Sequence, residues 1–234
     1  MLIVHSGLPK TGTTPLQQVL SEKADALSDT SYIYVEGFRG ADAVGHHALP
    51  LELITADTAE QTEQRKFLDY LTQHADKTVL LSSEAFTNCL TDRSFVALKE
   101  FLAAANEITP VVWVCTLRRV DEFMQSMYLH QVKHNEIAAT IDEYLSVRWH
   151  WMRAKLRYLA ELSKSGAVSE VIYHKYQPGP DYMDTLMGQL QLSEEQKAIV
   201  GPIPRLNESL TFKAQVLLLH FDHFVAELPG WLNP

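Results

Sequence analysis

The sequence has little of several features that would define particular classes of protein. Its 234 residues include only two cysteines, Cys89 and Cys115, and both lie among apolar residues, so a stabilising framework of disulfides is excluded. No apolar run reaches the roughly 20 residues that a membrane helix needs. Because the first apolar run begins at Leu2, we expect no secretory leader. We therefore expect a cytoplasmic protein that does not associate with a membrane.

Basic residues are also scarce. The chain has 20 Lys and Arg against 29 Asp and Glu, which gives a formal net charge of −9. A nucleic-acid partner is not expected at this charge, and a bound anion would need a local basic pocket. Spacing typical of metal ligands is missing as well, because His46 and His47 are adjacent and the other histidines are scattered. We expect no metal site.

The chain does have alternating apolar and amphipathic segments, and 46% of its residues are hydrophobic. This alternation predicts an α/β fold with three layers, a parallel sheet flanked by helices, in one domain over residues 1–234. The predicted strands begin at Leu2 and cover residues 31–35, 78–83, 110–117 and 168–173. The predicted helices cover about 14–27, 59–75, 92–106, 120–134, 141–163, 182–191 and 210–227, and residues 36–58 are expected to be irregular.

The most informative stretch is the loop after the first apolar run. Gly7 and Gly12 have the G-x-x-x-x-G spacing of a phosphate-binding loop, in which successive backbone N–H groups point toward an anion. In the ATP-binding form of this motif a lysine and a Ser or Thr follow the second glycine. Here Thr13 and Thr14 hold those positions, and Lys10 lies inside the loop. The displaced lysine argues against transfer of the γ-phosphate of ATP.

A helix start follows this loop directly. Thr14 is the expected N-cap, Pro15 suits the first helical position, and Gln17 stands where the second member of a capping box would be. A helix N-terminus beside a glycine loop favours a bound anion, because its unpaired N–H groups and its dipole both attract negative charge.

The run Pro9-Lys10-Thr11-Gly12-Thr13-Thr14 resembles the 5′-phosphosulfate loop of the sulfotransferase family. That family transfers a sulfuryl group from 3′-phosphoadenosine-5′-phosphosulfate (PAPS) to an acceptor. The resemblance is nearest to compact bacterial carbohydrate sulfotransferases, because the loop lacks the aromatic residue that follows it in phenol and steroid enzymes. It implies that residues 9–14 bind the donor and that Lys10 stabilises charge on the leaving group, with no metal required.

A second motif lies at the end of the strand over residues 110–117. Arg118 follows this strand and Ser126 comes eight residues later, on the next predicted helix. The pair is similar to the 3′-phosphate motif of sulfotransferases, in which an arginine and a serine bind the 3′-phosphate of the donor. A forked guanidinium and a hydroxyl suit a phosphate. The alternative is an arginine pair, Arg118 and Arg119, at a strand end beside an ordinary helical serine.

A third segment stands before the last predicted helix. Arg205, Asn207 and Ser209 form an Arg-x-Asn-x-Ser pattern that looks like a short version of the late loop that closes over the donor in sulfotransferases. Asn207 or Ser209 as the N-cap of the following helix is an alternative explanation, and both can hold.

Two places provide a candidate general base. Glu84 ends a buried strand, at the position where related cytosolic enzymes have a catalytic histidine. His46 and His47 lie in the loop where other carbohydrate sulfotransferases have acceptor-binding or basic residues, and histidine titrates nearest to neutral pH. The alternatives are a structural hydrogen-bonding role for Glu84 and a surface loop for the histidines. We favour Glu84 slightly over His47.

Together these motifs predict a sulfotransferase that uses PAPS and an acceptor hydroxyl, less readily an amine, of a carbohydrate or other small molecule. Two other classes stay open, a P-loop nucleotide kinase or NTPase and a non-catalytic nucleotide-binding module on the same fold. The acceptor would be bound by residues 36–58 and 130–155, which contain no motif, and the oligomeric state is open.

Overall fold

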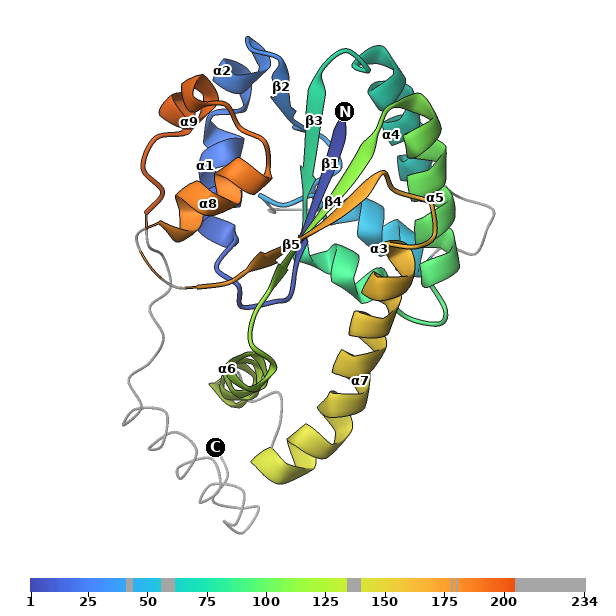
Figure 1. Cartoon of the computed structure of the whole chain (residues 1–234), viewed down its shortest axis with the longest axis vertical. Helices are drawn as coiled ribbons and strands as arrows, with labels where there is room; N and C mark the ends of the chain where they lie inside the picture. The colour runs from blue at the N-terminus through green and yellow to red at the C-terminus, as the bar shows by residue number, and fades with distance from the viewer. Residues whose placement is uncertain (41–43, 56–61, 134–139, 178, 180, 205–234) are drawn as a thin grey trace, which may run out of the picture. The chain divides into compact units, whose positions relative to one another are not determined.

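The computed structural model describes residues 1–40, 44–55, 62–133, 140–177, 179 and 181–204 (Figure 1). Its contacts group the chain into two compact units, and one domain over residues 1–234 stays a prediction. The first comprises Met1–Arg118 and Ala154–Leu206, and Arg119–Arg153 belongs to the second. The sheet and the loop after its first strand belong to the first unit.

The first unit is built on five strands, and every pair of neighbours is parallel. The strands are β1 (Leu2–Gly7), β2 (Tyr32–Tyr34), β3 (Thr78–Ser82), β4 (Val111–Leu117) and β5 (Glu170–Lys175), in the order β2-β3-β1-β4-β5. This confirms the α/β class predicted from the sequence. Because all the strands are parallel, the carboxyl ends of β3, β1 and β4 meet at one edge of the sheet.

Helices cover both faces of this sheet (Figure 1). One layer contains α1 (Thr14–Glu22), α2 (Ala24–Ser28), α8 (Tyr182–Gln189) and α9 (Glu194–Val200); the other contains α3 (Ala48–Thr55), α4 (Thr62–Gln73), the 3₁₀ helix η1 (Glu84–Cys89) and α5 (Phe95–Ile108). Successive strand residues face opposite layers, so Leu2 and Val4 pack with the second layer and Ile3 with the first. The result is a three-layer fold with a hydrophobic core on each face of the sheet.

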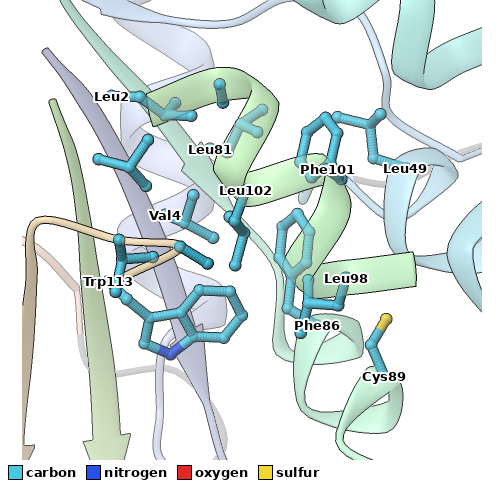
Figure 2. Close-up of a cluster of buried hydrophobic side chains, with 14 of the residues drawn as sticks. Leu2, Val4, Leu49, Leu81, Phe86, Cys89, Leu98, Phe101, Leu102 and Trp113 are labelled. Atoms are coloured by element: carbon cyan, nitrogen blue, oxygen red, sulfur yellow. The ribbon is translucent and has the colours of Figure 1, made fainter. Parts of the chain in front are cut away.

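Figure 2 shows the core on the α5 side. The ring of Trp113 on β4 meets that of Phe86 on η1 edge to face, with centroids 5.8 Å apart. Both side chains are fully buried. Burial of such a ring stabilises a fold by roughly 1.5–3 kcal/mol. This contact fixes η1, and therefore Glu84 at its first position, against the central sheet.

The second unit contains α6 (Val120–Lys133) and the first part of α7 (Ile141–Leu162), and from Ala154 onward α7 belongs to the first unit. Aromatic pairs connect the two helices, because Phe123 stacks on Trp151 at 6.3 Å and Tyr128 lies 5.3 Å from Tyr144. In the part of the chain that the structure describes, no helix combines the length and the apolar character that crossing a membrane requires.

The structure corrects two local expectations. Residues 48–55, expected to be irregular, form α3; Leu49 and Leu53 are buried on one face of it, and Pro50 lies in its first turn, where a missing N–H is tolerated. The first predicted helix is two helices, α1 and α2, with Lys23 between them. The helix expected over residues 210–227 lies outside the described residues.

Candidate functional site

Three predicted site segments lie at the carboxyl edge of the sheet. The loop after β1 begins at Leu8, the segment after β3 contains Ser83 and Glu84, and Arg118 follows β4. These strands are neighbours, with β1 between β3 and β4. Parallel α/β sheets bind ligands at this edge. The fold therefore brings the predicted phosphate loop, one candidate base and the predicted phosphate-binding arginine to one edge of one unit.

Four carbonyl groups of the loop after β1 accept hydrogen bonds. The pairs are Leu8 O with the Thr11 hydroxyl (2.7 Å), Lys10 O with Arg118 Nη1 (3.3 Å), Thr11 O with the Tyr182 hydroxyl (2.8 Å) and Thr13 O with the Gln17 backbone N–H (3.0 Å). In a trans peptide the carbonyl and the following N–H point in opposite directions. The donors that hold the carbonyls of Lys10 and Thr11 therefore also set the direction of the N–H groups of Thr11 and Gly12.

The amide groups of the same loop remain available to a ligand. Among the described residues, the backbone N–H groups of Thr11, Gly12 and Thr13 donate no hydrogen bond. The N-cap of α1 is Thr13 rather than Thr14, and no side chain caps the helix. Pro15 occupies its first turn. The loop and the start of α1 thus present backbone donors that have no partner among the described residues and that suit an anionic ligand.

The backbone of the loop is held in an unusual conformation. Lys10 and Gly12 have φ angles of 67° and 68°. The left-handed region suits glycine but costs other residues on the order of 1–2 kcal/mol. At Gly7 the requirement is space, because a Cβ there would lie 2.9 Å from the Thr11 hydroxyl. Alternating right- and left-handed residues form concave arrays of N–H groups that bind anions.

Of the two arginines after β4, Arg118 is the one that contacts the loop. Its guanidinium donates to Lys10 O and lies 5.1 Å from the ring centroid of Tyr176. Arg119, in the second unit, instead pairs with Asp121 at 2.5 Å and with Glu122 at 3.5 Å. This favours Arg118 as the phosphate ligand. Ser126 lies on α6 in the second unit, and Arg205, Asn207 and Ser209 lie outside the described residues.

The segment after β3 carries an unpaired carboxylate oxygen. Glu84 is half-buried at the start of η1, and its Oε2 is buried without a hydrogen-bond partner in the described part of the chain. A buried oxygen without a partner costs free energy, and a ligand that donates a proton or a hydrogen bond would remove that cost. This geometry suits a ligand with a hydroxyl group, which can donate its proton to Oε2.

His47 lies beside Glu84 and is oriented by Ser83. The Nδ1 atom of His47 is 2.6 Å from the Ser83 hydroxyl oxygen, which also accepts the Ala85 N–H at 3.1 Å. The hydrogen bond holds one edge of the His47 ring at Ser83. Which of the two atoms donates depends on the tautomer of the ring.

His46 has a different environment. It is fully buried, with Nδ1 accepting the Ser82 N–H at 2.9 Å and Nε2 2.6 Å from the Val35 carbonyl. Burial lowers its pKa to about 4. Both ring nitrogens bond to backbone groups, so this side chain attaches the loop before α3 to the end of β3. It offers no lone pair to the hydroxyl group of a substrate.

Sequence analysis missed a polar cluster beneath the loop. His5 on β1 lies 2.8 Å from the Ser82 hydroxyl and 3.2 Å from the Thr116 hydroxyl, and the Gln17 side chain donates to Ser82 at 3.0 Å. Gln17 therefore bonds to β3 rather than closing a capping box. The sequence signal that could have revealed this cluster is a histidine, His5, inside a strand that is buried on both faces. Tyr182, which holds Thr11 O, gave no sequence signal.

No three His, Cys, Asp or Glu side chains within the described ranges are close enough together to hold a metal ion. Comparison of the chain with protein-family models, with curated proteins and with solved structures gave no match.

Proposed function

We propose that the protein is a sulfotransferase that moves the sulfuryl group of PAPS to a hydroxyl of a carbohydrate or small-molecule acceptor. The observation that carries this proposal is that the backbone carbonyl and N–H groups of the loop after β1 differ in their hydrogen bonding. Its carbonyls are engaged by Thr11, Arg118, Tyr182 and the first turn of α1, whereas its amides are left to a ligand. Such a loop fits the 5′-phosphosulfate of the donor.

Two further features support PAPS over ATP. Thr13 stands where an ATP-binding loop has its lysine, and Lys10 lies within the loop. Arg118, at the end of the neighbouring strand, provides a forked cation suited to a second phosphate. We assign the 3′-phosphate to Arg118, with Ser126 as the proposed hydroxyl ligand from α6. A donor with anionic groups at both its 5′ and 3′ ends would use both sets of ligands.

The proposed reaction divides its work between two strand ends. The new S–O bond forms to the acceptor oxygen while the S–O bond to the 5′-phosphate breaks. The loop amides and Lys10 stabilise the charge on the departing phosphate. Glu84 takes the proton of the acceptor hydroxyl through its unpaired Oε2. His47, which is hydrogen-bonded to Ser83, is the second candidate base, and His46 has a structural role.

Isothermal titration calorimetry with the product nucleotide, 3′-phosphoadenosine-5′-phosphate, tests the proposal. We expect saturable binding that is weaker for adenosine 5′-phosphate, which lacks the 3′-phosphate. Absence of binding at high micromolar concentration would overturn the proposal. Hydrolysis of ATP with Mg²⁺ would indicate the phosphoryl-transfer alternative, and binding without sulfate transfer to a broad panel of acceptors would indicate a non-catalytic module.

A further inference from the structure

A continuous series of buried polar groups runs beneath the phosphate loop, and none of them belongs to the proposed ligand-binding set. It starts at Gln17 in α1 and passes through Ser82 at the end of β3, His5 on β1 and Thr116 on β4. These four side chains are buried in the first unit. The β-sheet register places His5 opposite Ser82. The series therefore depends on the alignment of three strands.

The direction of each hydrogen bond follows from the first donor. The side-chain amide of Gln17 donates to the Ser82 hydroxyl oxygen, so the proton of the Ser82 hydroxyl goes to His5 Nδ1. The remaining proton of a neutral His5 is then on Nε2 and is donated to the Thr116 oxygen. Burial, with the nearby His174 as a smaller influence, lowers the pKa of His5 to about 3, which keeps the ring neutral.

The loop itself is held by Tyr182, whose hydroxyl donates to the carbonyl of Thr11 at 2.8 Å. Thr116 neighbours Tyr182: burial raises the pKa of Tyr182, and the Thr116 hydroxyl opposes that shift to a smaller extent. The peptide that contains this carbonyl also contains the N–H of Gly12, and no peptide bond of the described chain is cis. Holding the Thr11 oxygen toward Tyr182 therefore turns the Gly12 N–H to the opposite side, where the ligand is proposed to bind.

We infer that the series continues from Thr116 to Tyr182, so that Tyr182, which holds the Thr11 carbonyl, and with it Thr116 and His5, are positioning residues that aim the Gly12 N–H at the anion. The identity of the anion rests on the proposed function, but the orientation of the amide does not. A pre-set donor lowers the cost of ordering the loop when the ligand binds.

The chain offers a matched pair of variants to test this inference. Tyr182→Phe removes the hydroxyl that holds the loop carbonyl. Tyr32→Phe removes another buried hydroxyl, which donates to the Leu190 carbonyl at 2.9 Å, away from the loop. We expect Tyr182→Phe to weaken binding of 3′-phosphoadenosine-5′-phosphate roughly three- to tenfold, as loss of one hydrogen bond does, and Tyr32→Phe to leave the affinity unchanged.

A second measurement needs no nucleotide. Amide hydrogen exchange at Gly12, followed by NMR in the full chain, should change in Tyr182→Phe and stay as in the wild type in Tyr32→Phe. Thr116→Val removes a hydroxyl and should reproduce the Tyr182→Phe exchange, whereas Thr116→Ser keeps the hydroxyl and should restore the wild-type rate. Thermal melts of all four variants establish that the differences do not come from unfolding.

The outcomes separate this inference from the proposed function. Equal effects of Tyr182→Phe and Tyr32→Phe on affinity and on Gly12 exchange would overturn the positioning role, even if the nucleotide binds. A wild-type protein that fails to bind the nucleotide, but shows the exchange difference between the two tyrosine variants, would overturn the proposed function and leave the positioning role intact.

Discussion

The loop after β1 and the segment after β3 end neighbouring strands but have opposite hydrogen-bonding character. In the loop, the carbonyls of Lys10 and Thr11 have partners and the N–H groups of Thr11, Gly12 and Thr13 have none among the described residues. In the segment after β3 the N–H groups of Ser83 and Ala85 have partners, His5 O at 3.0 Å and the Ser83 hydroxyl oxygen at 3.1 Å. There the atom without a described partner is an acceptor, Glu84 Oε2.

Under the proposed function, this difference would let one sheet edge serve both sides of a group transfer. Unpaired donors match an anionic leaving group, and an unpaired carboxylate oxygen matches a hydroxyl that must lose its proton. The contrast follows from short stretches of sequence, a glycine loop with Lys10 in one case and Ser-Ser-Glu before a 3₁₀ helix in the other. Each half can be altered separately, so the comparison is open to experiment.

The largest expected effect is that of Glu84→Gln, which keeps the size of the side chain and removes its capacity to take a proton. We expect kcat for sulfate transfer to fall about 10²–10⁴-fold, with little change in KM for the donor. Glu84 Oε2 has no hydrogen-bond partner among the described residues, so the substitution breaks no hydrogen bond at this atom. The melting temperature should therefore not fall.

His47→Gln is the control for that experiment, since the Nδ1 of His47 is tied to Ser83. It should reduce kcat far less than Glu84→Gln. If His47→Gln instead abolished transfer while Glu84→Gln left it intact, the proton acceptor would be the histidine. The segment after β3 would then differ from the loop after β1 through His47 and not through Glu84.

Arg118→Ala sharpens the donor side of the comparison and has the next largest expected effect. Loss of a hydrogen-bonded cation costs roughly 1.5–3 kcal/mol, so the affinity for 3′-phosphoadenosine-5′-phosphate should fall about 10- to 150-fold. Adenosine 5′-phosphate should lose less, through the bond from Arg118 to Lys10 O alone.

Arg119→Ala provides the matched control, because the Arg119 guanidinium is exposed and pairs with Asp121 and Glu122. Calorimetry should give the wild-type affinity for this variant. Equal losses for the two nucleotides in Arg118→Ala would contradict the assignment of the 3′-phosphate to Arg118.

The sheet and the loop after β1 were predictable because their signals are local. Apolar runs such as Val111–Leu117 mark strands buried on both faces, and the spacing of Gly7 and Gly12 marks the loop. The sequence also predicts that Glu84 and Arg118 each follow a strand. That these two strands are the neighbours of β1 comes from the structure.

The hydrogen bonds that shape the loop were not predictable, because their partners are far apart in the chain. Tyr182 and Thr11 are separated by 171 residues, and His46 and Ser82 by 36. Gln17 shows the same limit, since local rules assign it to a capping box, whereas the sheet register brings Ser82 within its reach. The structural role of His46 likewise depends on a strand that the loop meets only in the folded protein.

The smallest expected effect concerns His46 and asks whether the region after β3 has a second titratable base. Burial lowers its pKa to about 4 in the folded protein, from an ordinary value of 6.5. The unfolded chain therefore binds a proton first, so the stability associated with this histidine is complete above pH 6.5 and is lost as the pH falls toward 4. One such histidine should cost about 2 kcal/mol between pH 7 and pH 5.

Denaturant unfolding of the wild type and of His46→Gln at pH 7 and pH 5 measures this difference. The wild type should lose about 2 kcal/mol more than the variant over that interval. His47→Gln, in which the substituted ring is only half-buried, should retain the wild-type dependence. A wild type and a His46→Gln variant with equal pH dependence would mean that His46 takes up a proton in the folded protein. The end of β3 would then have two proton acceptors, His46 and Glu84. The segment after β3 would no longer differ from the loop after β1 by Glu84 alone.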